Sequence, residues 1–346
     1  MTRLDEEVKA ILTQYEGEWN GAFERAEGGW NNTTRLLRQA GGGVVLRIYE
    51  THRDRAKIEF EHEVLLLLSG QKLPFRIPVP VKTRSGETLV ELSDGSGRYA
   101  CLFEYIEGEQ VSDPSPMLDY AFGEAAARLS KALVAVSPAG TPAYPPYYEL
   151  TAAYPECTPE RVASFCRQPP APFAALSEPL DRLGRLYTDL PGQLGALRRL
   201  PHQLVHGDLN YSNLLAVAGG GQRVAALLDF EFCTWDVRAM EAAVAISGLF
   251  KGEDEGREAV RQFCRGFGGQ LRMAREEADA IPALMRLRKL DVFLHFLTRY
   301  WNGIDGADPL IRQIGQQAAE LDRLERNMPW LIETVMEEMP EKLEKP

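Results

Sequence analysis

Two short acidic segments separated by a glycine-rich turn constrain what this chain can fold into more than any other feature. They are the sequences HGDLNYSN at 206–213 and VAALLDF at 224–230. Apolar runs predict short strands at 204–205, 214–218 and 224–228. The glycine triplet 219–221 predicts a hairpin turn between the last two runs. We therefore expect Asp208, Asn213 and Asp229 to lie close together at the ends of strands.

Two carboxylates and one carboxamide at this spacing suit phosphoryl transfer from a nucleoside triphosphate. In that reaction one Asp accepts or orients the proton of the acceptor hydroxyl, while an Asn and a second Asp hold Mg²⁺ against the phosphates. We therefore predict Asp208 as the base, with Asn213 and Asp229 as metal ligands. Each segment alone also fits a turn or a strand end with an acidic cap, but the two in this order favour the catalytic interpretation.

The two segments together resemble the catalytic signature of the aminoglycoside phosphotransferase and choline kinase superfamily. Gly207 and Glu231 stand where protein kinases have Arg and Gly, which points to small-molecule substrates. The resemblance implies an α+β, two-lobed protein-kinase-like fold, with an antiparallel sheet and one main helix in a small N-terminal lobe and a larger, mostly helical C-terminal lobe. We expect a nucleotide-binding lobe at 1–107 and a catalytic and substrate-binding lobe at 108–346.

The same resemblance implies a phosphate-binding turn and a basic residue in the first lobe. Segment 23–37 reads as two strands joined by a turn whose small residues and amides let backbone N–H groups approach phosphate oxygens; these are Gly28, Gly29, Asn31 and Asn32. A simple hairpin turn is the alternative. The next strand, 44–49, carries a Lys in the superfamily, and this chain has Arg47, which keeps the charge without being equivalent to Lys.

Two further nucleotide-binding features are implied by the order of elements. The ion-pair Glu of the superfamily falls on Glu61 in a helix expected at 55–68, with Glu59, Glu63 or a merely solvated carboxylate as alternatives. The strand expected at 99–106 runs into the hinge between the lobes. There the backbone of Glu104 and Ile106 would bind the adenine edge, between apolar walls formed by Phe103 and Ile48.

Helical patterns dominate the second lobe. We expect helices at 117–136, 177–200, 258–267, 276–301 and 309–339, separated in part by proline-rich runs at 137–146 and 168–172 that we interpret as connectors, with a substrate-side insertion as the alternative. By resemblance, a helix start follows Asp229, with Glu241 in the place of an Asp that supports the catalytic loop. His206 should fix that loop through hydrogen bonds.

Acceptor specificity should be decided by residues near the end of the helix expected at 276–301 and by residues that follow Asp229. By resemblance these are Trp235, Asp236, Arg299, Tyr300, Trp301 and their neighbours. The helix at 276–301 also carries basic residues that either receive an acidic substrate group or form a solvated basic face, namely Arg286, Arg288, Lys289 and Arg299.

Composition excludes several classes of protein. The chain has 346 residues, 45% apolar and 26% charged, as is ordinary for globular proteins, and no run approaches the ~20 apolar residues of a membrane span. A net charge of −11 disfavours nucleic acid as a partner, and it suits either a cationic substrate or simple solubility. Five scattered cysteines predict reduced thiols in the cytoplasm. The acidic N-terminus lacks the apolar region of a secretory signal, and we expect no association with a membrane.

The function that the resemblance implies is that of a Mg²⁺- and ATP-dependent kinase acting on a hydroxyl of a small metabolite. Segments 28–32, 45–49 and 103–108 look most like the type II homoserine kinase branch, so homoserine or another amino alcohol is the favoured acceptor. An aminoglycoside-type antibiotic phosphotransferase is one alternative. A catalytically silent binding or structural member of the same fold is another, for which Arg47 and Glu241 are the suggestive departures.

Overall fold

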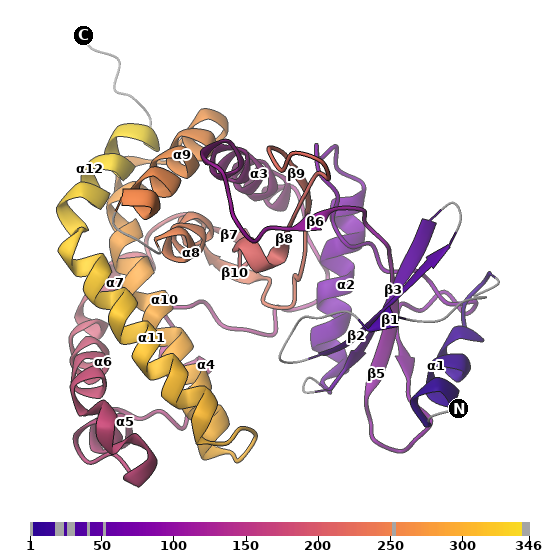
Figure 1. Ribbon diagram of the computed structural model, residues 1–346, viewed down its shortest axis with the longest axis horizontal. Helices are drawn as coiled ribbons and strands as arrows, with labels where there is room; N and C mark the ends of the chain where they lie inside the picture. Colours follow the sequence, from indigo (N-terminus) through magenta and orange to yellow (C-terminus); the bar gives the residue numbers. More distant parts are fainter. Residues whose placement is uncertain are drawn as a thin grey trace.

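An antiparallel sheet with two helices occupies one end of the molecule, and a larger group of helices occupies the other (Figure 1). The computed structural model describes residues 3–17, 24–25, 32–39, 42–50, 53–250 and 254–340. The two helices beside the sheet are α1 (Arg3–Leu12) and α2 (Arg55–Ser69). This layout agrees with the two-lobed α+β fold expected from the sequence, and the boundary between 107 and 108 stays a prediction.

The strands of the N-terminal sheet run in the order β1-β2-β3-β5-β4, and each neighbouring pair is antiparallel. Their bounds are Glu24–Arg25 for β1, Asn32–Gln39 for β2, Gly42–Tyr49 for β3, Val90–Glu91 for β4 and Tyr99–Glu104 for β5. The expected pairing of two strands within 23–37 is present as β1 and β2. The turn between them, residues 26–31, lies outside the described residues.

The side chains of β3 belong to two different apolar clusters because successive residues of a strand point to opposite faces. Leu46 and Ile48 pack with Ile11 of α1 on one face of the sheet. Arg47 lies on the other face, where its guanidinium is 5.2 Å from the ring centroid of Phe103. Ile48 therefore does not share a face with Phe103, and the expectation that both would wall one adenine pocket was wrong.

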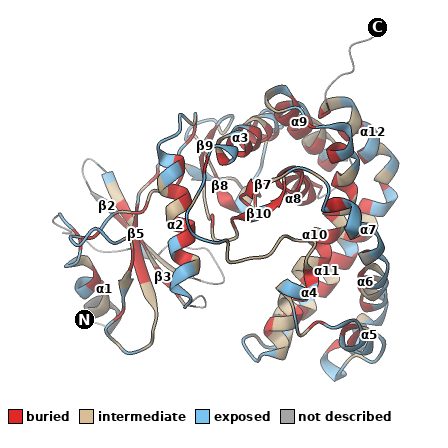
Figure 2. Cartoon of the chain, turned by 180° about the vertical axis from the view of Figure 1, so that it is seen from behind, coloured by how far each residue is buried: buried red, intermediate tan, exposed pale blue. Residues whose placement is uncertain are grey.

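Helix α2 brings a carboxylate into the interior. Asp54 caps its first turn by accepting a hydrogen bond from the amide of Ala56 at 3.0 Å. Figure 2 shows that α2 has both buried and exposed residues. The buried ones include the apolar Val64 and Leu65, and Glu61 is buried with them. A buried carboxylate needs a charged or hydrogen-bonding partner, so the position of Glu61 already indicates a polar site between α2 and the sheet.

Two small sheets lie between the N-terminal sheet and the helices, and they carry the two acidic segments. One runs β6-β8-β9 and the other pairs β7 with β10. Their bounds are Glu109–Gln110 for β6, His202–Val205 for β7, Leu214–Ala216 for β8, Val224–Leu227 for β9 and Thr234–Val237 for β10. The expected hairpin is present as antiparallel β8 and β9. Strand β10 was not expected; the helix predicted to start in this stretch begins after it, at Met240.

Helices make up the rest of the second lobe. They are α3 (Pro116–Val134), α4 (Leu150–Ala153), α5 (Pro159–Arg167), α6 (Ser177–Asp189), α7 (Pro191–Leu197), α8 (Met240–Leu249), α9 (Asp254–Gln270), α10 (Arg275–Trp301), α11 (Ala307–Arg326) and α12 (Met328–Glu338), with 3-10 turns η1 (Ala171–Leu176) and η2 (Tyr211–Asn213). The helix expected at 309–339 is two helices that meet at Asn327, because Pro329 suits a first turn and not a helix interior.

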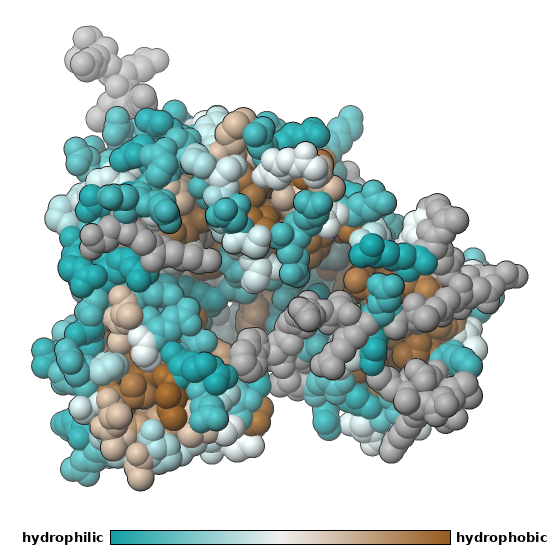
Figure 3. Space-filling model, in the orientation of Figure 1, coloured by the Kyte–Doolittle hydropathy of each residue, from teal (hydrophilic) through white to brown (hydrophobic). Residues whose placement is uncertain are grey.

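The helices pack around a buried apolar core, while hydrophilic atoms cover most of the face shown in Figure 3. Helices α3 and α9 approach most closely at two glycines. A Cβ on Gly266 would lie 2.0 Å from the carbonyl oxygen of Tyr120, and one on Gly123 would lie 2.1 Å from that of Phe263. Among the described helices none is long and apolar enough to span a bilayer.

Candidate active site

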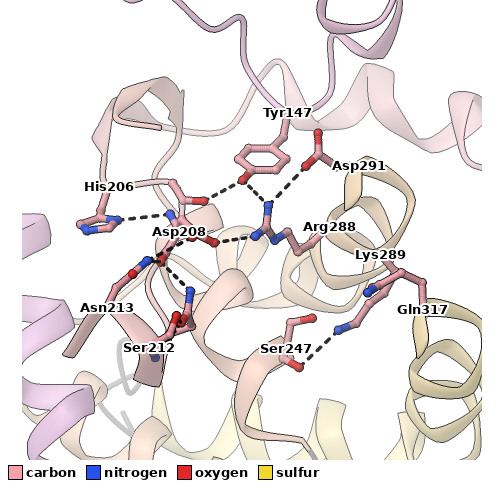
Figure 4. Close-up of polar contacts among 12 residues, drawn as sticks. Tyr147, His206, Asp208, Ser212, Asn213, Ser247, Arg288, Lys289, Asp291 and Gln317 are labelled. Atoms are coloured by element: carbon pink, nitrogen blue, oxygen red, sulfur yellow. Dashed lines mark hydrogen bonds and ion pairs between the residues drawn. The ribbon is translucent and has the colours of Figure 1, made fainter. Parts of the chain in front are cut away.

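The segment after β7 folds into a tight loop that places Asp208 beside Asn213. The side-chain nitrogen of Asn213, Nδ2, donates to the Asp208 carboxylate at 3.1 Å and to the Asp208 backbone carbonyl at 2.9 Å (Figure 4). Gly207 makes this turn possible, because its φ is 81° and a Cβ there would lie 2.6 Å from the carbonyl of Phe232. The structure thus joins the predicted base to one predicted metal ligand.

His206 ties the first acidic segment to the second. Its Nδ1 accepts a hydrogen bond from the Asp208 amide at 3.2 Å, so Nε2 carries the proton and donates to the Leu228 carbonyl at 2.9 Å. Burial lowers the pKa of His206 to about 4, which keeps the ring neutral. These contacts agree with the prediction that His206 fixes the loop and is not a base.

Glu241 supports the same loop from α8. Its carboxylate accepts a hydrogen bond from the His206 amide at 2.7 Å, and the side chain is fully enclosed. The extra methylene of Glu, relative to the Asp of the superfamily, therefore does not prevent the supporting contact. Burial raises the pKa of Glu241 to about 8, since the hydrogen bond from His206 only partly offsets desolvation.

Asp229 stands in a strained backbone conformation next to the loop. Its φ is 66°, and no other described non-glycine residue has a positive φ. Such a conformation is costly for a residue with a Cβ and is found mainly at functional sites. The adjoining Leu228 amide donates to the Asn213 carbonyl at 2.8 Å, which holds the two acidic segments together.

Asn213 and Asp229 would supply oxygen ligands of the kind that Mg²⁺ prefers. The Asn213 nitrogen points to Asp208, which leaves its oxygen as a ligand. No cluster of three or more His, Cys, Asp or Glu that would hold a metal occurs among the described residues. Two protein oxygens are nevertheless enough where phosphate oxygens and water complete the shell, as is usual for Mg²⁺ in phosphoryl transfer.

Arg47 connects the sheet to both α2 and the second acidic segment. Its Nη1 lies 3.3 Å from a Glu61 carboxylate oxygen and 3.4 Å from one of Asp229. Burial works against its charge, yet Asp229 and Glu61 raise the pKa of Arg47 above its ordinary value. The predicted pairing of Arg47 with Glu61 is therefore present in this structure.

The two alternatives to Glu61 are engaged elsewhere. Glu59 pairs with Arg55 at 2.7 Å on the exposed side of α2. Glu63 accepts hydrogen bonds from the amides of Ala139 and Gly140, at 2.7 and 3.0 Å, in the first proline-rich run. Neither carboxylate faces Arg47, so the structure leaves Glu61 as the partner.

The remaining nucleotide-binding predictions are only partly within the described residues. Gly28, Gly29 and Asn31 lie outside them. Asn32, at the start of β2, donates from its side chain to Glu231 at 3.1 Å, so it reaches across to the second acidic segment. This hydrogen bond joins the N-terminal sheet to the C-terminal lobe, and Asn32 belongs to the turn that we expect to bind the phosphates.

At the expected hinge, Phe103 and Ile106 are buried and Glu104 lies at the end of β5. The Glu104 amide already donates to the Val79 carbonyl at 3.0 Å, and its side chain pairs with Arg76 at 2.7 Å. An adenine ring bound at this edge would therefore have to form its hydrogen bonds with the Glu104 carbonyl and the backbone of Ile106.

Two residues that sequence reasoning did not place in the site, Tyr147 and Asp291, hold Arg288 against the carboxylate of Asp208. Arg288 donates from Nη2 to Asp208 at 2.5 Å and from Nη1 to the Tyr147 hydroxyl at 2.8 Å and to Asp291 at 3.3 Å (Figure 4). Tyr147 in turn donates to the Gly207 carbonyl at 2.7 Å. Burial raises the pKa of Asp208 and Arg288 opposes that rise, so Arg288 helps to keep the carboxylate ionised.

The sequence contained a signal for the contact between Arg288 and Asp291, but none for the contacts of Tyr147. Arg288 and Asp291 are three positions apart on a helix, a spacing that puts side chains together. Tyr147 follows the first proline-rich run, which we interpreted as a connector. The run does connect α3 to α4, and its end also reaches the catalytic loop through Tyr147.

The residues expected to decide specificity differ in how near they lie to the catalytic loop and in how far they are buried. Asp236 is buried and accepts hydrogen bonds from the Tyr147 amide at 2.7 Å and the Val237 amide at 2.6 Å, which anchors Tyr147 near the site. Trp235 is exposed. Tyr300 packs against Phe173 and η1, at the end of α10 away from Arg288.

Comparison with known proteins gives one family and a consistent set of relatives. A family model described as the phosphotransferase enzyme family matches residues 22–280. A homoserine kinase of Methylobacillus glycogenes is 26% identical over 268 residues, covering 77% of this chain and 76% of that protein. One of Granulibacter bethesdensis is 25% identical over 307 residues, covering 88% and 89%.

Solved structures share the fold at low sequence identity. A microcompartment-associated aminopropanol kinase has a TM-score of 0.65 at 18% identity, covering 94% of this chain and 97% of that one. The GDP complex of an aminoglycoside 2'-phosphotransferase has a TM-score of 0.62 at 17% identity, covering 94% and 100%. Because the family model spans most of the sequence, including both acidic segments, this chain belongs to the phosphotransferase enzyme family and is a kinase that transfers phosphate to a hydroxyl group.

Proposed function

We propose that the protein uses Mg²⁺ and ATP to phosphorylate the hydroxyl of a small amino alcohol, with homoserine as the favoured acceptor. The observation that carries this proposal is the direct hydrogen bond from the Asn213 side chain to the Asp208 carboxylate, with the Leu228 amide bonded to the Asn213 carbonyl so that Asp229 follows beside this loop. The homoserine kinases among the relatives favour the acceptor. The nucleotide follows from neighbours crystallised with AMP-PNP or GDP.

The residues of the chain take the following roles in this proposal. Asp208 accepts the proton of the acceptor hydroxyl. The hydroxyl oxygen forms a bond to the γ-phosphorus of ATP while the bond from that phosphorus to the β–γ bridging oxygen breaks, so that a phosphate ester and ADP form. Asn213 and Asp229 hold Mg²⁺, which when bound neutralises charge on the phosphates. Arg47, kept in place by Glu61, contacts the phosphates.

Nucleotide binding in the first lobe uses the remaining predicted positions. We assign phosphate contacts to the turn that contains Gly28, Gly29, Asn31 and Asn32. The base would lie against Phe103, with the Glu104 carbonyl and the backbone of Ile106 at its edge. The lobe boundary at 107 and 108 places the hinge directly after these residues. The described cysteines are free and buried, which suits the reducing cytoplasm that we propose as the site of action.

The contacts of Arg47 and Glu241 weigh against the silent alternative. Both residues depart from the superfamily pattern, yet Arg47 pairs with Glu61 and Glu241 supports the His206 amide. The departures therefore preserve the interactions that a working site needs.

Two measurements on the purified protein test this proposal. A thermal-shift series with ATP, GTP and Mg²⁺ should give metal-dependent stabilisation, about 2.7 kcal/mol at a nucleotide concentration of 100 times Kd. ADP release should then rise with homoserine and other amino alcohols and stay at background with Asp208→Ala. Release only with aminoglycosides would favour the antibiotic alternative, and no nucleotide-dependent shift would favour the silent one.

A further inference from the structure

The basic residues on α10 differ in how fully they are paired inside the protein. Three of the four that the sequence singled out have carboxylate partners of their own. Arg286 binds Glu325 through Nε and Nη2 at 2.6 and 2.8 Å, Arg299 binds Asp305 through the same two atoms at 2.6 and 3.1 Å, and Lys289 pairs with Glu320. The bidentate or direct pairing of these three residues leaves them less available to a substrate than a free basic group would be.

Arg288 is different because its Nε–Nη2 edge is not filled. A guanidinium has five N–H donors, and the described contacts of Arg288 engage Nη1 twice and Nη2 once. Nε has no partner among the described contacts, and Nη2 carries a second donor besides the one to Asp208; these two nitrogens form the edge that Arg286 uses for Glu325 and that Arg238 uses for Glu277. The side chain of Arg288 is 21% exposed, so it is not sealed inside the protein.

The position of that edge restricts the length of any ligand. Arg288 Nη2 is 2.5 Å from Asp208, the proposed base, so an anionic group on the Nε–Nη2 edge lies next to the place where the acceptor hydroxyl must sit. Tyr147 and Asp291 hold the guanidinium in this orientation (Figure 4). Only an acceptor with its hydroxyl a few bonds from an anionic group reaches both.

The charges around Arg288 define the acceptor further. Asp208 and Asp291 bring two negative charges to one guanidinium, so an anion that arrived alone would be repelled. A carboxylate accompanied by an ammonium group leaves the net charge of the cluster unchanged. Planar carboxylates also match the fork of an arginine, which gives two parallel hydrogen bonds.

We propose that Arg288 binds the carboxylate of the acceptor through Nε and Nη2, so that the preferred acceptor is a hydroxylated amino acid and not an amino alcohol without a carboxylate. This assignment rests on the proposed function and narrows it. Arg288 then contacts substrate and base at once, and the bound carboxylate sets the distance of the hydroxyl from Asp208.

Three acceptors test the assignment: homoserine and two compounds that each lack one of its charged groups. Homoserine carries both charged groups, 3-aminopropan-1-ol lacks only the carboxylate, and 4-hydroxybutanoate lacks only the ammonium. We expect kcat/KM to be highest for homoserine. Arg288→Gln should lower kcat/KM for homoserine about 30-fold or more, since truncating one partner of a desolvated charge pair has an effect of this size. Its effect on 3-aminopropan-1-ol should be at least tenfold smaller.

The matched control is Arg286→Gln, two residues away on the same helix, which should leave both acceptors nearly unchanged. Thermal unfolding with and without Mg·ATP verifies that each variant folds and binds nucleotide. Equal losses on both acceptors would show that Arg288 serves only Asp208, and a wild-type preference for 3-aminopropan-1-ol would equally overturn the carboxylate assignment while leaving the kinase intact. Phosphorylation of none of the three would remove the proposed function and this assignment together.

Discussion

The guanidinium of Arg47 lies 3.4 Å from the carboxylate of Asp229, so a residue of the N-terminal sheet contacts a proposed metal ligand of the other lobe. The same nitrogen is 3.3 Å from Glu61 of α2. One cation therefore holds carboxylates from two distant segments. Removing it would leave Glu61 buried without its charged partner, a costly situation in a low-dielectric interior.

Arg47→Lys should keep nucleotide affinity within about tenfold, because the charge remains although the fork is lost. Arg47→Ala should weaken Mg·ATP binding about 10- to 100-fold, the range expected for losing hydrogen bonds to a charged group. Titration calorimetry measures both. Arg55→Ala, on the exposed side of α2, is the control and should bind normally. Normal binding by Arg47→Ala would exclude a phosphate contact.

Asp208 and Asp229 should separate turnover from binding. Asp229→Ala should abolish the metal-dependent part of nucleotide binding, whereas Asp208→Ala should retain binding and lower kcat at least about 100-fold, as for loss of a general base. Thermal shifts with ATP, with and without Mg²⁺, and ADP release give the two readouts. The opposite pattern would reverse the two assignments.

Arg288 should also affect the pH dependence of the reaction. It opposes the burial-driven rise in the pKa of Asp208, so Arg288→Gln should raise that pKa further. A base must be ionised, and the acidic limb of kcat/KM should therefore move to higher pH in the variant. The profile is measured with 3-aminopropan-1-ol, which lacks the carboxylate. An unmoved limb would show that Asp208 does not sense Arg288.

Glu241 should make stability depend on pH. Its folded pKa of about 8 lies above the ordinary value of 4.5, so its protonated form favours folding; that contribution is complete below pH 4.5 and is lost as pH rises through 8. Glu241→Gln resembles the protonated form and should remove this loss, at most about 1.4 kcal/mol per pH unit. Denaturant unfolding from pH 5 to 9 measures the difference from wild type.

A control for this change is Glu333→Gln, an exposed carboxylate on α12. This variant should follow the wild-type profile across the whole range. A Glu241→Gln profile parallel to wild type would mean that Glu241 is already ionised in the folded protein at pH 5.

Two glycines of α9 should respond oppositely to alanine. Gly266→Ala forces a Cβ against the Tyr120 carbonyl at 2.0 Å, so it should lower the free energy of unfolding by roughly 1–3 kcal/mol or more through overpacking. At Gly269 the nearest atom is the Tyr120 hydroxyl at 3.8 Å, and Ala should be neutral or stabilising by up to about 1 kcal/mol. Chemical denaturation of both variants tests the pair, and equal effects would show that α3 can shift.

Local sequence was sufficient for features that depend on neighbouring residues. The hairpin of β8 and β9 followed from apolar runs around a glycine triplet, and the loop of Asp208 and Asn213 followed from their spacing. The pairing of Arg47 with Glu61 came from the resemblance to the superfamily and not from local pattern. Strand alternation was also available, and applying it to Ile48 would have placed that side chain with α1.

Tertiary structure decided which charges meet across long separations. Spacing along the helix pairs Arg288 with Asp291, but it does not predict which distant carboxylate each arginine meets. Only packing brings Asp208 to Arg288 and Glu325 to Arg286. Tyr147 reaches the catalytic loop because Asp236 holds its amide. Side-chain contacts between distant segments depend on how whole elements pack, and a linear pattern records only the spacing within each element.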